Sequence, residues 1–360
     1  MFRRSLFRRS LTVVLALVLA LGGVATLAAT GAREAPETGG RQTDGAEGEA
    51  SDELTVYTYD VFPQPLSDAV TAHFEEEYGV EVTWERFADT GQLFNQVYLE
   101  RDNPEADVVI GLDNTYLGRI YDSELFERYE PEDIRLREEF LLVDPEYRAI
   151  PFDYGFVTLN YDSRSLSDPP ETWEDLTSEA YRDSIVLMNP ATASPGRNFL
   201  LLTVAEFGAD EFTDYWERLE PNILTITSTW SEGYGLYTQG EAPIVLSYST
   251  SPAYHIAYED VTRYKALYLD GTAYAQIEVA GIAKGARNRI NAERFIDFML
   301  GPEFQSEIAL NQIMYPVHPD VELPDSFQEI PQPERTVSLD EESVLENIQT
   351  WLDEWEQVMR

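Results

Sequence analysis

The sequence predicts an α/β protein with mostly parallel sheets, and three observations lead to this fold class. Short runs of apolar and β-branched residues alternate with stretches of helical periodicity over most of the chain. Hydrophobic residues make up 43% and aromatic residues 12% of the 360 residues, which is enough for large packed cores. Because a domain usually has roughly 100–200 residues, the chain beyond its N-terminal segment is long enough for two domains.

The expected elements follow one another in the order typical of βαβ units. Strands are expected at 54–59, 81–87, 107–111, 150–161, 184–188, 223–227, 243–248 and 275–283. Helices are expected at 66–78, 90–101, 195–207, 211–219, 231–239, 288–300, 302–313 and 339–359. Gly79 ends the first helix. The last helix carries an apolar stripe made of Leu345, Ile348, Leu352 and Trp355 and should clamp onto a domain.

The chain is strongly acidic. Its 66 Asp and Glu residues against 25 Lys and Arg residues give a formal charge of 25 − 66 = −41. This balance excludes nucleic acid as a partner, because binding to phosphates needs a basic surface. The cations are arginines except for Lys265 and Lys284. We interpret this surface as an adaptation to molar salt, where the Debye length is about 3 Å and self-repulsion is screened.

The absence of cysteine limits the chemistry further. It excludes disulfides, thiolate zinc sites, a catalytic thiolate and a lipidated-cysteine anchor. The three histidines, His73, His255 and His318, are not spaced like metal ligands, so we expect no metal site. No nucleophile elbow, P-loop or paired-histidine motif is present, so we expect no enzyme and no cofactor.

The N-terminus is an export signal. Arg3-Arg4 and Arg8-Arg9 precede an apolar run from Leu11 to about Ala29. We assign residues 1–30 to a signal peptide of the twin-arginine or the general type, or to an uncleaved membrane anchor, because the run approaches the length that spans a bilayer core of ~30 Å. Residues 31–52 are polar and small, and they should form a flexible acidic linker.

Aromatic, hydroxyl and carboxylate side chains gather where several expected strands end. These clusters lie at 57–60, 113–114, 152–155, 230–234 and 248–254. In α/β folds, ligands bind outside the carboxyl ends of strands. Ring faces attract cations by roughly 0.5–2 kcal/mol each and stack on planar heterocycles, so the clusters indicate a cleft for a flat, cationic ligand.

Two expected helix starts have the features of anion sites. Ser194 should cap the helix that begins with Pro195, and Asp89-Thr90 precedes another helix. Free amides and hydroxyls at a helix N-terminus bind phosphate, although capping alone explains the same residues equally well.

Six segments resemble thiamine-binding proteins, the extracytoplasmic receptors of thiamine ABC transporters, in order and spacing. They are 54–60, 106–114, 151–155, 230–236, 246–256 and 314–317. The resemblance extends from Leu54 to the helix containing Trp351 and Trp355. Combined with the acidic surface, it identifies the chain as a haloarchaeal-type member of that family.

The resemblance implies a two-lobed type II periplasmic-binding-protein fold, with mixed or parallel sheets flanked by helices and a ligand cleft between the lobes. Lobe 1 should comprise 53–152 plus 276–360, and lobe 2 should comprise 153–275. The implied ligand is thiamine or its mono- or diphosphate. The expected contacts are Tyr59, Asp89, Thr90, Asp113, Ala193, Ser194, Trp230, Tyr248, Ser249, Thr250, Ser251 and Tyr254. Among these, Asp113 would offset the charge of the ligand, as Asp153 also could.

Two positions depart from the family pattern: Ala193 lacks a hydroxyl, and Ile313 stands where the family has tryptophan. The expected protein is an exported monomer that delivers its ligand to permease subunits with a cytoplasmic ATPase. It would associate with the membrane through the permease or its N-terminal segment. The alternative is a receptor for ferric ion, a polyamine or an oxyanion. A thiaminase-like enzyme is disfavoured because that chemistry needs a cysteine.

Overall fold

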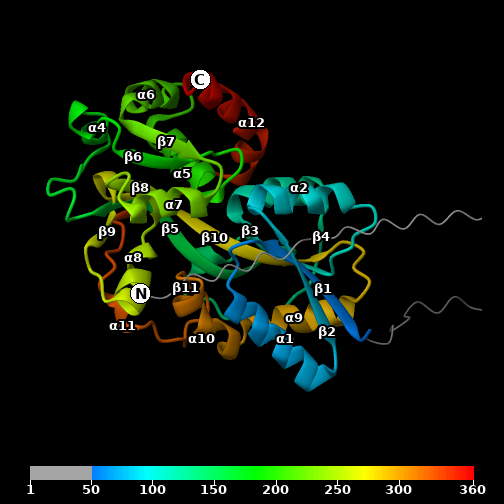
Figure 1. Ribbon diagram of the computed structural model, residues 1–360. Helices are drawn as coiled ribbons and strands as arrows, with labels where there is room; N and C mark the ends of the chain where they lie inside the picture. Colours follow the sequence, from blue (N-terminus) through cyan, green and yellow to red (C-terminus); the bar gives the residue numbers. More distant parts are fainter. Residues whose placement is uncertain (1–50) are drawn as a thin grey trace, which may run out of the picture. The chain divides into compact units, whose positions relative to one another are not determined.

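The computed structural model describes residues 51–360, so the expected signal and nearly all of the expected linker lie outside the described part (Figure 1). Twelve strands form one hydrogen-bonded mixed sheet with the order β2-β1-β3-β10-β5-β8-β6-β7. Four short strands lie off this path, with β4 and β12 on β10 and β9 and β11 on β5. The strands are β1 (Glu53–Tyr59), β2 (Glu81–Phe87), β3 (Val108–Asp113), β4 (Phe126–Glu127), β5 (Ile150–Asp162), β6 (Ile185–Met188), β7 (Ile223–Thr227), β8 (Ile244–Tyr248), β9 (Tyr264–Leu267), β10 (Thr272–Ala283), β11 (Tyr315–Pro316) and β12 (Arg335–Val337).

Helices flank both halves of this sheet. They are α1 (Gln64–Tyr78), α2 (Thr90–Glu100), α3 (Leu117–Asp122), α4 (Trp173–Leu176), α5 (Ser194–Phe207), α6 (Phe212–Leu219), α7 (Trp230–Gln239), α8 (Ser251–Glu259), α9 (Arg289–Leu300), α10 (Pro302–Asn311), α11 (Asp325–Gln328) and α12 (Glu341–Val358). The element types expected from periodicity are confirmed, and their ends differ from the expected ones by at most three residues. No helix of residues 51–360 has the length and apolarity needed to cross a membrane.

Two parallel groups of strands are joined by two long antiparallel strands. β1 pairs in parallel with β2 and β3, and β6 pairs in parallel with β7 and β8. β5 and β10 pair with each other over Tyr274–Ala280 and each continues into one of the two groups. The lobe boundaries that we expected at 152/153 and 275/276 fall inside these two strands.

Three apolar clusters pack on the sheet. Leu54 and Val56 of β1 belong to one cluster and Tyr57 to another, because alternate residues of a strand face opposite sides. The remaining cluster packs on β6 and β8 and includes α12 through Trp351 and Trp355. The terminal helix therefore packs on the core of the second half of the sheet, and it also contacts α3, which follows β3 in the first half.

Two local expectations were wrong. Leu345 is 37% exposed, because α12 turns the stripe of Val344, Ile348, Trp351, Leu352 and Trp355 inward. Ser194 is not a side-chain cap: α5 begins one residue earlier, with Ala193 in the cap position and no side-chain cap hydrogen bond. The Ser194 hydroxyl instead donates to the Asp113 carboxylate of β3. A bond to a distant strand thus replaces the local cap.

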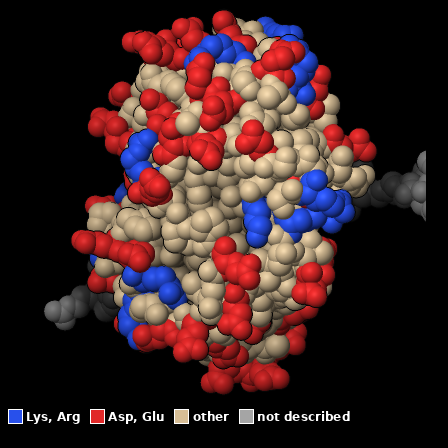
Figure 2. Space-filling view, turned by 90° about the vertical axis from the view of Figure 1, so that its left-hand side faces the viewer, with Lys and Arg blue, Asp and Glu red and all other residues tan. Residues whose placement is uncertain are grey.

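Carboxylates cover much of the surface but not all of it. On the face in Figure 2, acidic side chains occupy much of the upper and lower parts, and the centre is largely uncharged, with Lys and Arg side chains to its right. The acidic side chains on this face are in contact with solvent, where ions screen their charge.

Candidate functional site

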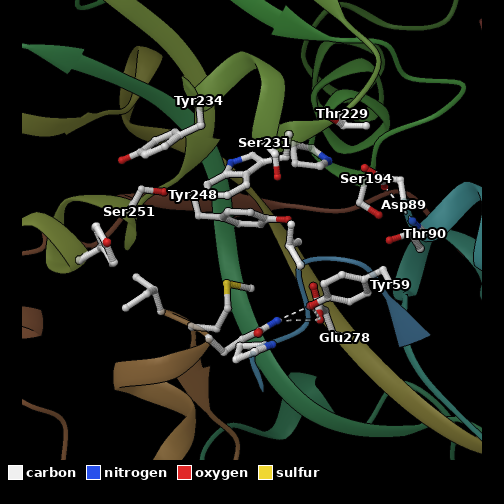
Figure 3. Close-up of a pocket in the computed structure, with 18 of the residues that line it drawn as sticks. Tyr59, Asp89, Thr90, Ser194, Thr229, Ser231, Tyr234, Tyr248, Ser251 and Glu278 are labelled. Atoms are coloured by element: carbon white, nitrogen blue, oxygen red, sulfur yellow. Dashed lines mark hydrogen bonds between the residues drawn. The ribbon is translucent and has the colours of Figure 1, made fainter. Parts of the chain in front are cut away.

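A cavity of about 540 Å³ lies between the first turns of several helices and the strands β1, β8 and β10 (Figure 3). Its size is typical of sites for small organic ligands. The lining includes the first residues of four helices: Thr90 of α2, Ser194 of α5, Trp230 of α7 and Ser251 of α8. Helix N-termini present free amides and the positive end of the helix dipole, so this wall favours an anionic or hydroxylated group.

Eight of the twelve residues expected at the site line this cavity. They are Tyr59, Asp89, Thr90, Ser194, Trp230, Tyr248, Ser251 and Tyr254. The structure brings them together from both halves of the sheet, because β5 and β10 place the two halves side by side.

The other four expected residues lie behind the cavity wall. Asp113 accepts hydrogen bonds from the backbone amide and the hydroxyl of Thr115 and from Ser194. Ala193 is the cap residue of α5, and Thr250 is the cap residue of α8. Ser249 and Thr250 are fully buried. These four residues contact other protein residues and not the cavity. They shape the turns that carry the residues lining the cavity.

A second layer of rings and hydroxyls holds the aromatic wall. The Trp230 ring stacks on Tyr234 at 4.8 Å between centroids, and its indole nitrogen donates to Ser247 at 2.9 Å. The Tyr234 hydroxyl lies 2.9 Å from His255 Nε2, and His255 Nδ1 lies 2.6 Å from Glu259. Tyr234 was missed as a site residue, although its spacing of four from Trp230 on one helix could have revealed it.

A buried carboxylate, Glu278, forms part of the cavity floor and was also missed. It accepts hydrogen bonds from Tyr59 at 2.9 Å and Gln276 at 3.1 Å. Burial raises the pKa of Glu278 to about 8, and the Tyr59 hydrogen bond opposes this increase. Directly opposite on β5 lies Asp153, whose pKa is raised by burial and by the Glu278 charge. A carboxylate inside a strand of apolar residues was the available signal in the sequence.

Asp89 joins two of the helix N-termini. It caps α2 by accepting from the Thr90 amide at 2.7 Å. Burial raises the pKa of Asp89 to about 7, while hydrogen bonds from the Thr90 and Ser194 amides lower it. The same segment approaches Thr192 closely: a Cβ at Gly91 would lie 3.1 Å from the Thr192 carbonyl oxygen.

A second contact bridges α8 and α10 near the rim of the cavity. The exposed Tyr258 of α8 donates a hydrogen bond to the Leu310 carbonyl of α10 at 2.7 Å.

Replacing Asp153 by asparagine should stabilise the protein at pH 8 and less so at pH 5. The folded pKa of this acid is raised, so its protonated form contributes stability below the unfolded pKa near 4, and that contribution is lost as pH rises. An amide carries no charge at either pH and can donate to Glu278. We expect the melting temperature in molar KCl to rise at pH 8 by about 1.5 °C, the shift for roughly 1 kcal/mol at an unfolding entropy of about 2.1 cal/mol/K per residue.

The matched control is Glu303→Gln on the exposed surface of α10. It removes one carboxylate without changing the cavity, so its effect on the melting temperature should be the same at both pH values. An equal shift at pH 5 and pH 8 for Asp153→Asn would contradict the buried, protonated state of this acid.

The family model of bacterial extracellular solute-binding proteins matches residues 103–347. The chain belongs to this solute-binding family. A relative, the thiamine-binding periplasmic protein of Brucella melitensis, is 38% identical over 311 residues, which cover 85% of this chain and 92% of the relative. A solved periplasmic thiamin binding protein superposes with a TM-score of 0.77 at 32% identity, covering 86% of this chain and 96% of that one. The ferric binding protein from Campylobacter jejuni shares the fold with a TM-score of 0.72 at 19% identity, covering 85% of this chain and 99% of that one.

Membership confirms the expected fold class, an α/β solute-binding-protein fold of type II, and the expected family resemblance. A protein of this family is exported and works with an ABC transporter, and such receptors are generally not enzymes. Within residues 51–360 no group of three His, Cys, Asp or Glu side chains has a geometry that could hold a metal ion.

Ile313 and Ala193, the two departures from the family pattern, lie at different positions relative to the cavity. Ile313 lines the cavity with a φ of +59°, a left-handed conformation that is rare for a β-branched residue. Ala193 is buried behind the wall and offers no side-chain donor.

Proposed function

We propose that this protein is the receptor of an ABC transporter and that it captures thiamine or one of its phosphate esters. The observation that carries the proposal is the Trp230–Tyr234 stack beside four helix N-termini, in a chain 38% identical to a protein named for thiamine binding. The flat rings of thiamine suit the aromatic faces, and the hydroxyethyl or phosphate tail suits the amides at the helix starts.

We assign direct ligand contacts to the eight expected residues that line the cavity and add Tyr234 and Glu278 to them. Asp113, Ala193, Ser249 and Thr250 support the wall in this assignment. The cavity closes between two lobes that share β5 and β10, with α12 packed against elements of both lobes, and ligand binding stabilises the closed form. Bridging contacts such as Tyr258 to Leu310 favour closure.

The protein would pass its ligand to permease subunits driven by a cytoplasmic ATPase. Its N-terminal segment would either be removed on export or remain as a membrane tether, and the receptor would act as a monomer on the outer face of the membrane. The formal charge of −41 and the scarcity of lysine support a habitat of molar salt. At that ionic strength ligand choice depends on short-range contacts in the cavity.

Calorimetric titration tests the function. The full chain in molar KCl is titrated with thiamine, thiamine monophosphate and thiamine diphosphate, and we expect saturable binding of at least one of them at one site per chain. Circular dichroism establishes that the sample is folded. A folded protein that binds none of the three would overturn the proposal, and ferric citrate, a polyamine and phosphate would then be titrated as the alternative ligands.

A further inference from the structure

Three carboxylates lie side by side on neighbouring strands beneath the cavity. Glu278 of β10 is directly opposite Asp113 of β3 on one side and Asp153 of β5 on the other. Residues directly opposite one another on paired strands project to the same face of a sheet. We call Asp113, Glu278 and Asp153 the acidic row.

The acidic row lies beneath the cavity, and Glu278 is the member of the row that lines it. Glu278 is drawn on the cavity floor beside Tyr59 in Figure 3. Two residues along β5 from Asp153, and therefore on the same face, a Cβ at Gly155 would lie 2.8 Å from Met314 and 3.6 Å from Tyr248. Both of those residues line the cavity. Asp153 thus lies under the floor, next to Glu278.

The three acids differ in how their oxygens are satisfied. Asp113 accepts from Thr115 and Ser194, and Glu278 accepts from Tyr59 and Gln276. Asp153 is 0% exposed, and neither of its carboxylate oxygens has a hydrogen-bond partner. A buried carboxyl group without partners is costly, and its neighbours here are other acids.

No cation of the described chain compensates the row. The ion pairs of residues 51–360 use other carboxylates. The buried Arg197 guanidinium lies over the Tyr116 ring, 4.5 Å from its centroid. A floor of carboxyl groups that lacks a protein cation, and that can ionise beside a cation, is complementary to a cationic ligand.

We propose that the acidic row is the subsite for a positively charged ring of the ligand, and that Glu278 gives up its proton to solvent when this ring binds. This inference rests on the proposed function and names the part of the ligand that the floor recognises. In thiamine the cationic thiazolium also carries the tail, so its subsite must adjoin the site of the tail. The hydrogen bond from Ser194, at the start of α5, to Asp113 joins the two sites.

Glu278 can exchange its proton for the charge of a bound cation near neutral pH. It is faced by acids and phenols, namely Tyr59, Asp113, Asp153, Tyr248 and Asp89, and by the amides of Gln276 and Gln312. Burial is the main cause that raises its pKa to about 8, and the charges of Asp113 and Asp89 add to it, whereas the hydrogen bonds from Tyr59 and Gln276 lower it. Below that value it holds a proton in the empty cavity. A bound cation favours the ionised carboxylate, so affinity should rise between pH 6 and pH 8 as the proton becomes easier to remove.

The test compares three ligands by calorimetry in molar KCl. Thiamine and pyrithiamine carry a cationic ring, whereas deazathiamine has a neutral thiophene in its place and the same pyrimidine. Titrations in two buffers of different ionisation enthalpy count the protons released. The variants are Glu278→Gln, which keeps the shape of the side chain, and the surface control Glu303→Gln.

The natural protein should bind both cationic ligands at least about fivefold more tightly than deazathiamine, and it should release protons only with the cationic pair. Glu278→Gln should reduce this preference to less than about twofold and abolish the proton release, while Glu303→Gln should change neither. Equal binding of thiamine and deazathiamine by the natural protein would overturn the inference and leave the proposed function standing. If none of the three ligands binds, the proposed function fails and the inference fails with it. Proton counts in the natural protein decide the question even if Glu278→Gln does not fold.

Discussion

Gly111→Ala should destabilise the protein by about 3 kcal/mol and weaken ligand binding at the same time. Gly111 is in β3 with a φ of +102°, which an L-residue rarely adopts. A Cβ there would lie 2.3 Å from Cε1 and 2.5 Å from Cδ1 of Tyr59. The ring has to move, and it carries the hydroxyl that donates to Glu278 on the cavity floor. Urea unfolding in molar KCl measures the loss of stability, and calorimetry with thiamine measures the loss of affinity.

Gly79→Ala is the matched control, because Gly79 also has a positive φ, +66°, but a Cβ there would have no atom within 4 Å. It should cost about 1 kcal/mol through backbone strain alone and leave affinity unchanged. In a Tyr59→Ala background the steric part of the Gly111→Ala effect should disappear, since the clashing ring is absent. Equal losses for the two glycine variants would show that the contact with Tyr59 is unimportant.

Trp230→Ala should weaken the binding of thiamine at least about tenfold, which corresponds to about 1.4 kcal/mol. The indole lines the cavity at the start of α7, stacks on Tyr234 and is oriented by its hydrogen bond to Ser247. Alanine removes the ring face that a planar, cationic ligand would contact. Calorimetry in molar KCl measures the affinity of the variant and of the natural protein.

Trp230→Phe separates the ring face from the hydrogen bond. Phenylalanine keeps an aromatic face but cannot donate to Ser247, so its affinity should lie between those of the natural protein and Trp230→Ala. Thermal unfolding establishes that both variants are folded. Unchanged affinity in a folded Trp230→Ala protein would remove this residue from the site.

Most of the secondary structure could be predicted because its signals are local. The ranges 81–87 and 223–227 agree with β2 and β7 at both ends, and Gly79 ends α1 in a left-handed cap as expected. Helix α8 was not predicted, because its sequence begins within a cluster of tyrosine, serine and threonine that resembles a strand end. The wrong cap at Ser194 has a related cause. Its hydroxyl bonds to Asp113, a partner 81 positions away that no local pattern reveals.

The site residues divide in the same way, into those with a local signal in the sequence and those that depend on distant contacts. Tyr59, Asp89, Trp230 and Tyr248 could be found from the sequence because aromatic and capping residues at the ends of strands and the starts of helices are visible in local patterns. Glu278 stands out in the sequence as a carboxylate inside an apolar strand, but the local pattern does not reveal which residues lie beside it in the sheet. Its neighbours Asp113 and Asp153 come from strands that are adjacent only in the sheet.

The sequence by itself determined the α/β class, the family, the acidic character and the aromatic content of the site. These properties depend on periodicity, composition and short motifs, which a single chain displays directly. Only the tertiary structure decided which face each strand turns to the cavity and which carboxylates meet there. The order β3-β10-β5 is set by the packing of long antiparallel strands against three apolar cores. That packing places three acids far apart in the chain in one row, because residues opposite one another on paired strands share a face.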